Sequence, residues 1–369
     1  MKENDAGSDK NSFTRQILPW FYQNKRDLPF RHSKDPYQIW ISEIMAQQTQ
    51  IDTLIPYYER FIALFPTVKD LAEARESDVL KAWEGLGYYS RAKNLHKTAK
   101  MIHEEYADSF PSDFKTGLTL PGIGPYTGGA IYSIAFRQPV AAVDGNVLRV
   151  VCRYNNWPDD IGLNTTKKKV ENWVLSAQPE NAPGDFNESL MELGALICTP
   201  KNPKCEQCPL KAHCESYRKK TVDEIPFKLK KTKQTVHLIA VALIRRRDRY
   251  CLVKRPEKGL LGGMWGFPMI EYDSGNRAPE KALITELFLP KAASEIRAEY
   301  IGKTKHVFTH RIWEMNVYMV ELQDDFDPDL LNLPEQCIFE TMPEIKKHYA
   351  LPVAFSKITD LLEEQTERK

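Results

Sequence analysis

The stretch Leu120-Pro-Gly-Ile-Gly-Pro-Tyr-Thr127, followed by Asp144, carries most of the information about how this chain folds. Gly122 and Gly124 are separated by one residue, so the backbone can turn tightly there and approach another molecule closely. The next segment, residues 126–136, has the apolar character of a helix, and the free N–H groups of its first turn would point toward the turn. A helix start of this kind can hold a phosphate, although a lone Gly-x-Gly turn is also common at an ordinary corner between helices.

Two acidic residues in contrasting surroundings accompany this predicted hairpin. Glu43 lies in Trp40-Ile-Ser-Glu-Ile-Met45, an apolar helix in which desolvation raises the pKa of the carboxyl and favours a protonated acid. Asp144 precedes a predicted helix, whose first N–H groups and dipole favour the ionised form. Either residue alone is more typical of a salt-bridged helix acid or a plain helix cap. Together with the hairpin they indicate chemistry on a nucleic-acid backbone, and the order of hairpin and downstream Asp resembles the helix-hairpin-helix DNA glycosylases. The resemblance implies cleavage of an N-glycosidic bond, which needs a flipped base, a proton for that base and an anion near the sugar cation.

Length and composition set limits on the function. The chain has 369 residues, enough for two or three domains, and 42% of them are hydrophobic, which is ample for packed cores. The formal net charge is only +1, so DNA binding must rest on local basic patches. We find no signal peptide and no apolar run near the roughly 18 residues of a membrane span. We therefore expect a cytoplasmic, nucleoid-associated protein without membrane contact, in which residues 1–10 are disordered.

Four of the seven cysteines are crowded into one short segment, with the spacing Cys198-x6-Cys205-x2-Cys208-x5-Cys214. In a cytosolic protein this pattern indicates metal ligation rather than disulfides. The spacing alone leaves zinc and a 4Fe–4S cluster as equal alternatives, because the segment contains one CxxC pair instead of the two that zinc sites usually have. The other cysteines lie in apolar contexts and are expected to be core thiols: Cys152, Cys251 and Cys337.

The periodicity of the chain changes near residue 234. Residues 12–216 have helical apolar spacing with short Gly/Pro breaks, and helices are expected over 36–48, 51–64, 76–83, 88–105, 122–136, 145–154, 165–177 and 186–197. Residues 218–233 contain seven Lys or Arg against two acids and lose this periodicity. This segment is either a solvated tether or a basic linker that follows a phosphate backbone.

The remainder alternates between strands and turns and predicts an α+β domain. Strands are expected over 236–244, 250–254, 265–270, 300–307, 311–320 and 337–340, and helices over 279–288 and 352–364. The segment Gly259-Leu-Leu-Gly-Gly-Met-Trp-Gly-Phe-Pro268 resembles Nudix domains. A Nudix hydrolase needs a helix rich in glutamate to carry magnesium, and Glu280-Lys-Ala-Leu-Ile-Thr-Glu-Leu287 supplies too few carboxylates. We therefore interpret this domain as one that binds rather than hydrolyses.

Seven motifs, taken in order, make the chain resemble the MutY-type adenine DNA glycosylases, which belong to the helix-hairpin-helix, iron–sulfur DNA glycosylases. They are residues 26–31, 42–49, 85–91, 120–127, 143–147 and 186–188 and the cysteine loop. The resemblance implies a monofunctional enzyme that flips and excises adenine mispaired with 8-oxoguanine or guanine in double-stranded DNA and leaves an abasic site for base excision repair. The cysteine loop is similar to that of endonuclease III, which implies one 4Fe–4S cluster held by all four cysteines.

The resemblance also assigns roles to matching positions. Glu43 would protonate adenine N7 and Asp144 would stabilise the sugar cation, with support from Tyr126 and Asn146. The residues implied for the adenine pocket are Arg26, Leu28, Phe30, Arg31 and Glu188. The residues implied for contact with DNA are Gln48 and Tyr88 as wedges, Thr49 and Leu86 near 8-oxoguanine, Gly122 and Gly124 in the hairpin, and Phe308, Thr309 and His310 as the lesion-reading loop.

The fold class implied is a multidomain protein with an all-α helix-hairpin-helix region and a C-terminal α+β Nudix-like domain. The helical catalytic region would span 11–216, with a six-helix barrel over about 31–138 that contains the hairpin 120–127. An iron–sulfur subdomain would combine 11–30 with 139–216. The basic linker 217–234 and a Nudix-like lesion-recognition domain, 235–369, would follow. We expect the protein to act as a monomer.

Four residues depart from the family pattern, and one of them, Gln50, stands where some members have Arg, which weakens the expected contact with the DNA backbone. Phe30 and Ala46 stand where the family usually has Trp and Leu, and both changes remove packing volume near the pocket. Thr309 stands where the family has the Ser of a Phe-Ser-His loop. It keeps the hydroxyl and adds a methyl group, so we expect lesion recognition to survive.

Three other functions compete with this reading. An endonuclease III-like enzyme, which excises oxidised pyrimidines and cuts the strand, needs a lysine amine to form a Schiff base, at the hairpin position that Tyr126 occupies here. A non-catalytic iron–sulfur DNA-binding protein gives no reason for Glu43 and Asp144 to occur together. A Nudix hydrolase acting on free nucleotides lacks the acidic helix. The sequence therefore favours a glycosylase that leaves the strand intact.

Overall fold

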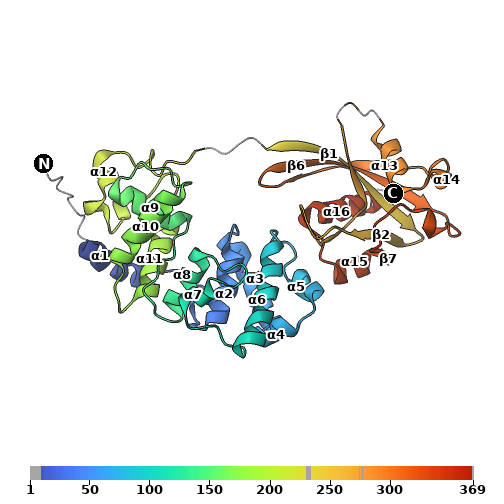
Figure 1. Cartoon of the computed structure of the whole chain (residues 1–369). Coiled ribbons are helices and arrows are strands. Elements are labelled where there is room, and N and C mark those ends of the chain that lie inside the picture. The colour runs from blue at the N-terminus through green and yellow to red at the C-terminus, as the bar shows by residue number, and fades with distance from the viewer. Residues whose placement is uncertain (1–9, 230–233, 274, 276–277, 368–369) are drawn as a thin grey trace. The chain divides into compact units, whose positions relative to one another are not determined.

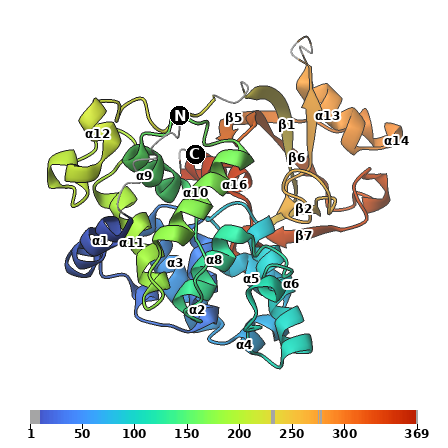
Figure 2. The same ribbon diagram turned by 60° about the vertical axis from the view of Figure 1, so that its left-hand side comes forward.

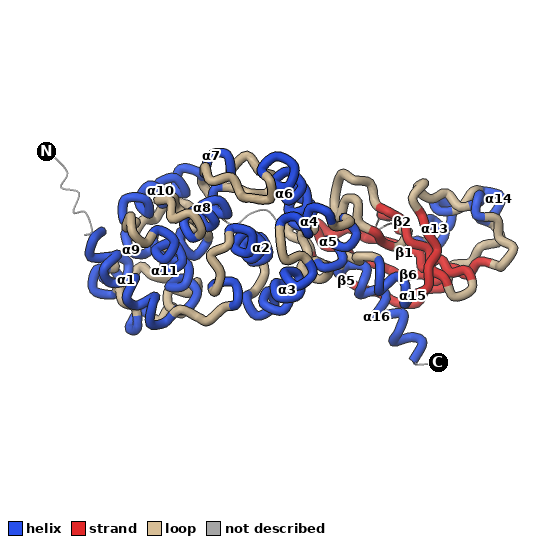
Figure 3. Tube along the Cα trace, turned by 90° about the horizontal axis from the view of Figure 1, so that it is seen from below, coloured by secondary structure: helices blue, strands red, loops and turns tan. Residues whose placement is uncertain are grey.

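The computed structural model describes residues 10–229, 234–273, 275 and 278–367, which form two compact units (Figure 1). The first, here called the helical unit, comprises Met1–Ala74 and Lys93–Lys231. The second, the sheet unit, comprises Arg75–Ala92 and Thr232–Lys369. Figure 3 shows that the strands of the described residues belong to the sheet unit. The predicted disordered segment 1–10 lies, apart from Lys10, outside the described residues, as do residues 230–233 of the predicted linker.

Short helices build the helical unit, as the apolar periodicity predicts. They are α1 (Lys10–Asn24), η1 (Pro29–Arg31), α2 (Pro36–Ala46), α3 (Ile51–Leu64), α4 (Val68–Glu73), α6 (Ser90–Tyr106), α7 (Phe114–Gly117), α8 (Pro125–Ile134), α9 (Gly145–Asn155), α10 (Asn164–Ala177), α11 (Pro183–Leu196), η2 (Cys205–Gln207), η3 (Lys211–His213) and α12 (Glu215–Lys219).

Helix α11 is the element around which this unit packs, because it contacts α1, α8 and α9. Its side chains Phe186 and Leu190 are fully buried in the core. In the same core, Phe13 of α1 meets Tyr154 of α9 and Trp173 of α10 edge-on, with ring centroids 4.7 and 4.9 Å apart. Edge-to-face ring pairs add roughly 0.5–1.5 kcal/mol beyond the burial of the rings. The core therefore fixes α11 relative to the start of α9.

Gly194 allows α11 to approach α9 closely. A Cβ atom at this position would lie 2.6 Å from Cβ of Asn146, which is nearer than real Cβ atoms come, and 3.2 Å from its Cα. The first turn of α9, capped by Asp144, therefore sits directly against α11 because residue 194 lacks a side chain.

The hairpin has the predicted turn, with the helix starting later than expected. Gly122 has φ +81°, in the left-handed region that favours glycine. Gly124 has φ −86° and precedes α8 as its cap, with no side-chain hydrogen bond and open space around its Cβ position. Helix α8 begins at Pro125 rather than at residue 122, because the proline fixes the φ of a first helical turn.

A seven-stranded sheet organises the second unit, in the order β3-β2-β1-β6-β5, with β4 paired to β1 and β7 to β2. Strands β1 and β6 are parallel, and the other pairs are antiparallel. The strands are β1 (Thr235–Arg246), β2 (Arg249–Lys254), β3 (Trp265–Gly266), β4 (Met269–Tyr272), β5 (Glu299–Val307), β6 (Arg311–Leu322) and β7 (Cys337–Thr341). The helices are α5 (Glu76–Ala82), α13 (Pro279–Leu287), α14 (Pro290–Ala293), η4 (Pro328–Leu330), α15 (Met342–His348) and α16 (Val353–Glu367).

Helices cover both faces of this sheet. On one face Val241 of β1 packs in a core with Phe355 of α16. The alternate residues of β1 point to the other face, where Ala240 packs in a core with Leu283 of α13. A central strand that is buried on both faces has a continuous apolar sequence, which explains the buried part of this run, residues 239–244. The two units together confirm the predicted fold class, a helical region followed by an α+β Nudix-like domain.

The predicted strand 265–270 is wrong in one respect: it is two short strands, β3 and β4, separated by Phe267 and Pro268. Pro268 has no N–H to donate to a ladder, while its carbonyl oxygen accepts a hydrogen bond from the Ala242 N–H at 2.8 Å. Phe267 is buried in the core, so the chain dips inward between the strands.

The first part of the predicted linker 217–234 packs against the helical unit. Its residues up to Lys219 belong to α12. Ile225 is 5% exposed, and its carbonyl oxygen accepts a hydrogen bond from Arg153 Nε at 2.6 Å. The described part of this basic segment is therefore anchored to α9 through Ile225.

Replacing Gly194 with alanine tests the close approach of α11 to α9. The added methyl group has no room, so the two helices must separate, and we expect a loss of about 1–3 kcal/mol in the free energy of unfolding. Gly145→Ala is the matched control, because the Cβ of residue 145 in the first turn of α9 meets nothing within 4 Å. Urea denaturation measures both variants, and equal stability of the two would contradict the tight contact.

Candidate active site

A cavity of about 250 Å³ in the helical unit is lined from η1, α2, α8, α9 and α11. Helix α2 packs on α8, and α8 packs on α11 (Figure 2). Each of these three helices contributes residues to the lining. The lining includes every residue predicted for catalysis or for the base pocket, and also Thr49. These residues are Arg26, Leu28, Phe30, Arg31, Glu43, Tyr126, Asp144, Asn146 and Glu188. Residues from five of the seven motifs thus meet in one place.

Glu43 is an acid held in a desolvated position on α2, between buried Ser42 and Ile44. The Tyr126 hydroxyl donates a hydrogen bond to its Oε2 atom at 2.6 Å. Burial raises the pKa of Glu43 from 4.5 to about 7, because desolvation outweighs the Tyr126 hydrogen bond and the carboxylates of Glu188 and Asp144 raise it further. Glu43 therefore carries a proton that it can donate near neutral pH, as its apolar helix predicts.

Asp144 caps α9 and is held by two donors. The Val147 N–H donates to Oδ1 at 2.7 Å, and Asn146 Nδ2 donates to Oδ2 at 2.7 Å. These helix-start hydrogen bonds favour the ionised form, as the sequence predicts, but they are not the largest influence on this carboxyl. Desolvation raises the pKa of Asp144, because burial outweighs the hydrogen bonds from Val147 and Asn146 and the charge of Arg149. Helix α9 orients the carboxylate, but the surrounding donors and charges do not offset its burial. A cation placed in the cavity would therefore stabilise its ionised form.

Two arginines and two glutamates form a charged wall of the cavity. Arg31 Nε lies 3.3 Å from Glu188 Oε1, while its Nη2 lies 2.9 Å from Oε2 of Glu192. Arg26 Nη2 lies 2.7 Å from the same Glu192 oxygen. Glu192 and its neighbour Met191 were missed by the sequence analysis. Glu192 could have been found from its spacing, because residues four apart on a helix share a face, and Glu188 was already assigned to the pocket.

The two residues predicted as wedges share an unusual backbone. Gln48 has φ 59° and Tyr88 has φ 48°, in the left-handed region that side chains other than glycine rarely adopt. Both side chains are exposed, Tyr88 by 48%. Leu86 is by contrast 8% exposed and packs in the protein interior, so a contact of its side chain with DNA stays a prediction.

The segment 308–310 forms the tight turn between β5 and β6. The Phe308 N–H donates to the Arg311 carbonyl at 2.8 Å, and the Phe308 ring packs edge-on against Trp313 with centroids 4.9 Å apart. The Thr309 and Tyr88 hydroxyls, both in the sheet unit, are 3.0 Å apart. His310 is exposed. The loop is thus anchored by Phe308 and presents Thr309 and His310 outward.

The four clustered cysteines line one small cavity of about 30 Å³: Cys198, Cys205, Cys208 and Cys214. Within the described residues, no three His, Cys, Asp or Glu side chains are arranged to hold a single metal ion. Arg153 Nη1 donates to the Cys198 sulfur at 3.5 Å. Four thiols around a cavity, with a cationic donor to sulfur, fit a multi-atom iron–sulfur cluster better than one zinc ion.

Arg149 connects this loop with the candidate active site. Its Nε donates to the Cys198 carbonyl at 2.7 Å, and its Nη2 donates to Oδ1 of Asn146 at 2.7 Å and to the Gly194 carbonyl at 2.8 Å. Asn146 is thereby fixed with its amide group toward Asp144.

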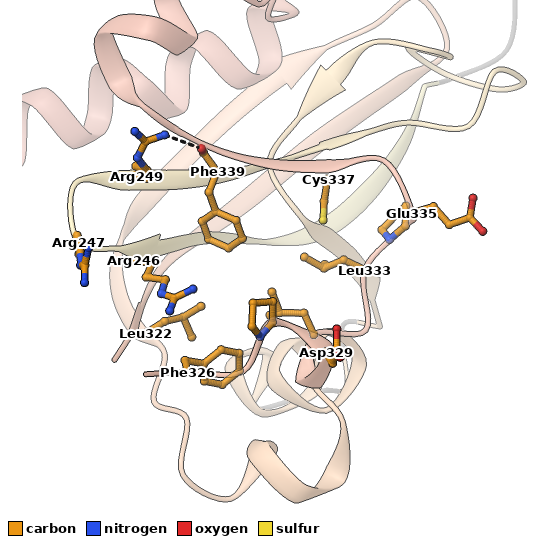
Figure 4. A pocket seen from close by; sticks show the side chains of 13 residues that line it. Arg246, Arg247, Arg249, Leu322, Phe326, Asp329, Leu333, Glu335, Cys337 and Phe339 are labelled. Atoms are coloured by element: carbon orange, nitrogen blue, oxygen red, sulfur yellow. Dashed lines mark hydrogen bonds between the residues drawn. The ribbon is translucent and has the colours of Figure 1, made fainter. Parts of the chain in front are cut away.

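A larger cavity, of about 800 Å³, lies in the sheet unit (Figure 4). It is lined by Arg246, Arg247 and Arg249 near the β1–β2 turn and by apolar side chains that include Phe326 and Phe339. Its lining contains none of the residues predicted for catalysis or DNA contact, so we do not assign the chemistry to it. No helix among the described residues is long and apolar enough to cross a membrane.

Three family models match the chain in succession. Residues 41–175 match the HhH-GPD superfamily base excision DNA repair protein, residues 198–214 the iron–sulfur binding domain of endonuclease III, and residues 240–361 the NUDIX domain.

Known proteins match over a longer span. An adenine DNA glycosylase of Buchnera aphidicola subsp. Schizaphis graminum is 37% identical over 303 residues, which are 81% of this chain and 84% of that protein. An adenine DNA glycosylase of Mus musculus is 34% identical over 374 residues, covering 85% of this chain and 72% of its own length. A solved structure of a thermostable thymine-DNA glycosylase is 32% identical, with a TM-score of 0.53, and covers 57% of this chain and 97% of that one.

Glu43→Gln tests the raised pKa through stability. The carboxyl ionises near pH 4.5 when unfolded and near pH 7 when folded, so the stability that depends on its proton is complete below pH 4.5 and is lost as pH rises through 7. Glutamine has no charge to bury, so the variant should become more stable than the wild type across this window. At pH 8 we expect the free energy of unfolding of the variant to exceed that of wild type by about 2 kcal/mol. This is less than the energy equivalent of the full pKa difference, because the carboxyl opens onto a cavity. Urea denaturation at pH 5 and pH 8 measures it, and a gap independent of pH would contradict the assignment.

Proposed function

The chain belongs to the adenine DNA glycosylases of base excision repair, and we propose that its substrate is adenine paired with 8-oxoguanine or guanine in duplex DNA. The observation that carries the proposal is the pairing of Glu43 and Asp144 in one cavity that is also lined by Arg26, Arg31 and Glu188. Two carboxylates in different surroundings can divide the work of protonating a base and stabilising a sugar cation.

In the proposed reaction Glu43 is the general acid. It donates its proton to N7 of a flipped adenine, and the hydrogen bond from Tyr126 orients the carboxyl for this transfer. The bond between N9 and C1′ then breaks, and its electron pair leaves with the protonated base. Asp144 stabilises the positive charge that develops on the sugar. Water then adds to C1′ to give the abasic site, and the proton that it releases restores the protonated Glu43. The raised pKa of Asp144 supports this role, because a nearby cation relieves the cost of a buried carboxylate.

The remaining lining residues would recognise the base. Arg26, Arg31 and Glu188 supply hydrogen-bonding groups for a purine edge, and Leu28 and Phe30 supply apolar surface. Phe30 is itself held by Tyr58, with ring centroids 5.7 Å apart. This contact supports a role for the phenyl ring as a wall of the pocket although the family usually has a larger residue there.

Each unit carries residues that we propose as contacts for DNA. Gln48 and Tyr88 would replace the stacking lost when adenine leaves the duplex, and Thr49 and Leu86 would lie near 8-oxoguanine. The hairpin around Gly122 and Gly124 would bind a phosphate at the start of α8, where no side chain caps the N–H groups. The turn with Phe308, Thr309 and His310 would read the lesion.

The cysteine loop binds one 4Fe–4S cluster, since it matches the corresponding domain of endonuclease III. Cys198, Cys205, Cys208 and Cys214 would hold it, and the cluster would supply a rigid cross-link for the loop. Arg149 and Arg153 bind this loop to α9. We infer no catalytic step at the cluster, and we propose that the enzyme acts as a monomer.

We expect adenine to be released without strand cleavage from a duplex with adenine opposite 8-oxoguanine, so that breaks appear after alkali treatment. Asp144→Asn should abolish release, because an uncharged amide cannot stabilise the sugar cation. Lys34, an exposed amine at the cavity, is the group to exclude as a Schiff-base nucleophile. Borohydride should therefore trap no covalent adduct, and an adduct that disappears in Lys34→Gln would show lyase activity instead. Absence of any adenine release would refute the proposed function.

The preference for 8-oxoguanine over guanine opposite adenine tests the turn between β5 and β6. Thr309→Ala removes a hydroxyl, and we expect the preference to fall roughly 5–10-fold, the effect of one hydrogen bond of about 1 kcal/mol. Thr309→Ser should preserve it. Tyr88→Phe controls for the loss of the contact between the Tyr88 and Thr309 hydroxyls. If Thr309→Ala and wild type discriminate equally, Thr309 does not read the lesion.

A further inference from the structure

Glu192 is a buried acid to which neither the resemblance nor the proposed reaction gives a task. It lies on α11 one helical turn after Glu188, and 1% of its side chain is exposed. Its oxygens accept four hydrogen bonds. Three come from Arg26, namely its backbone N–H (2.8 Å), Nε (2.9 Å) and Nη2 (2.7 Å), and one comes from Nη2 of Arg31 (2.9 Å).

These bonds fix a segment that has little regular structure of its own. Between α1 and α2 the chain contains one three-residue turn, η1, yet the head groups of Arg26 and Arg31 both line the cavity. Arg31 Nη1 also donates to the Arg26 carbonyl at 3.1 Å, and its Nε lies 3.3 Å from Glu188. The side chains thus form one continuous row, Arg26–Glu192–Arg31–Glu188.

The two glutamates of this row differ in charge. Desolvation works against ionisation of Glu192, but the hydrogen bonds from Arg26 and Arg31 outweigh it and lower its pKa to about 2. Burial raises the pKa of Glu188, which has the weaker contact with Arg31. Glu192 is therefore the permanent counter-ion of the two arginines, and Glu188 is left available to a base in the cavity.

We propose that Glu192 is a positioning residue of the adenine pocket, which holds Arg26 and Arg31 in place and limits the positive charge that reaches Glu43. The inference rests on the proposed function, in which Glu43 is the acid. The groups that face Glu43 are Tyr126 from α8, Asp144 at the start of α9, Glu188 from α11 and Arg31 from η1, with Arg26 and Lys34 further along the lining.

Among these groups, Arg31 lowers the pKa of Glu43. If the charge of Glu192 is removed, the charge of Arg31 is less compensated, and Glu43 loses its proton at a lower pH. A residue that acts only on folding would lower the rate equally at every pH.

The test is the pH dependence of single-turnover adenine release by Glu192→Gln, which keeps one acceptor oxygen and the side-chain shape but removes the charge. The alkaline limb of the profile should move about one pH unit lower, so that the ratio of the rate at pH 8 to the rate at pH 6 falls roughly 5-fold below that of wild type. Asp185→Asn is the matched control on α11, because the Asp185 carboxylate accepts a hydrogen bond from Tyr22 at 2.8 Å and does not line the cavity. Its profile should match wild type. An unchanged profile of Glu192→Gln, or a loss that is uniform in pH, overturns the proposal.

Arg26→Gln gives a second test should Glu192→Gln fail to fold. It removes positive charge from the other end of the same row, so the alkaline limb must move to higher pH. Movement to lower pH, or none, overturns the proposal.

A stability measurement separates failure of this inference from failure of the proposed function. The stability gained by Glu43→Gln between pH 5 and pH 8 should be smaller in the Glu192→Gln background, because Glu43 then ionises more readily. If this gain shrinks while the wild type releases no adenine, the positioning role holds and the function is wrong. If the wild type releases adenine and the gain is the same in both backgrounds, the function holds and the positioning role is wrong.

Discussion

The packing of α11 against α1, α8 and α9 is the constraint on which the candidate site depends. Its apolar face is committed to the core through Phe186 and Leu190, so its polar face has one orientation. That orientation places Glu188 and Glu192 in the cavity and brings Gly194 against Asn146. A close-packed core does not allow a helix to rotate by small amounts, so the position of the acids follows from the burial of rings on the opposite side.

Electrostatic contrast within a small volume is the second feature of the site. The cavity contains four carboxyl groups and two guanidinium groups from residues 26 and 31, and their surroundings separate their charge states. Glu192 is ionised by its arginines, whereas desolvation raises the pKa of Glu43 and Asp144. One compartment can thus hold a proton donor beside an anion, which acid–base chemistry on a buried base requires.

Sequence reasoning located the site because its motifs lie at the ends or on the buried faces of periodic helices. Glu43 in an apolar helix and Asp144 at a helix start are local patterns, and both lie where the patterns indicate. Properties that depend on distant residues were not accessible. The pKa of Asp144 is set by burial under other helices, and the importance of Glu192 depends on arginines that are more than 160 positions away in the chain. The break between β3 and β4 depended on the single missing N–H of Pro268, which a window of apolar residues conceals.

The left-handed backbone at Gln48 and Tyr88 has a consequence for how the protein meets its substrate. Each such residue costs on the order of 1 kcal/mol in the free protein, and neighbouring structure must maintain it. In the DNA complex that we propose, these two surface loops would keep a conformation that they already have, so less of the binding free energy would be lost to ordering them. At these two positions the protein is less stable than its fold would permit, and the proposed contact with DNA would explain why this cost is retained.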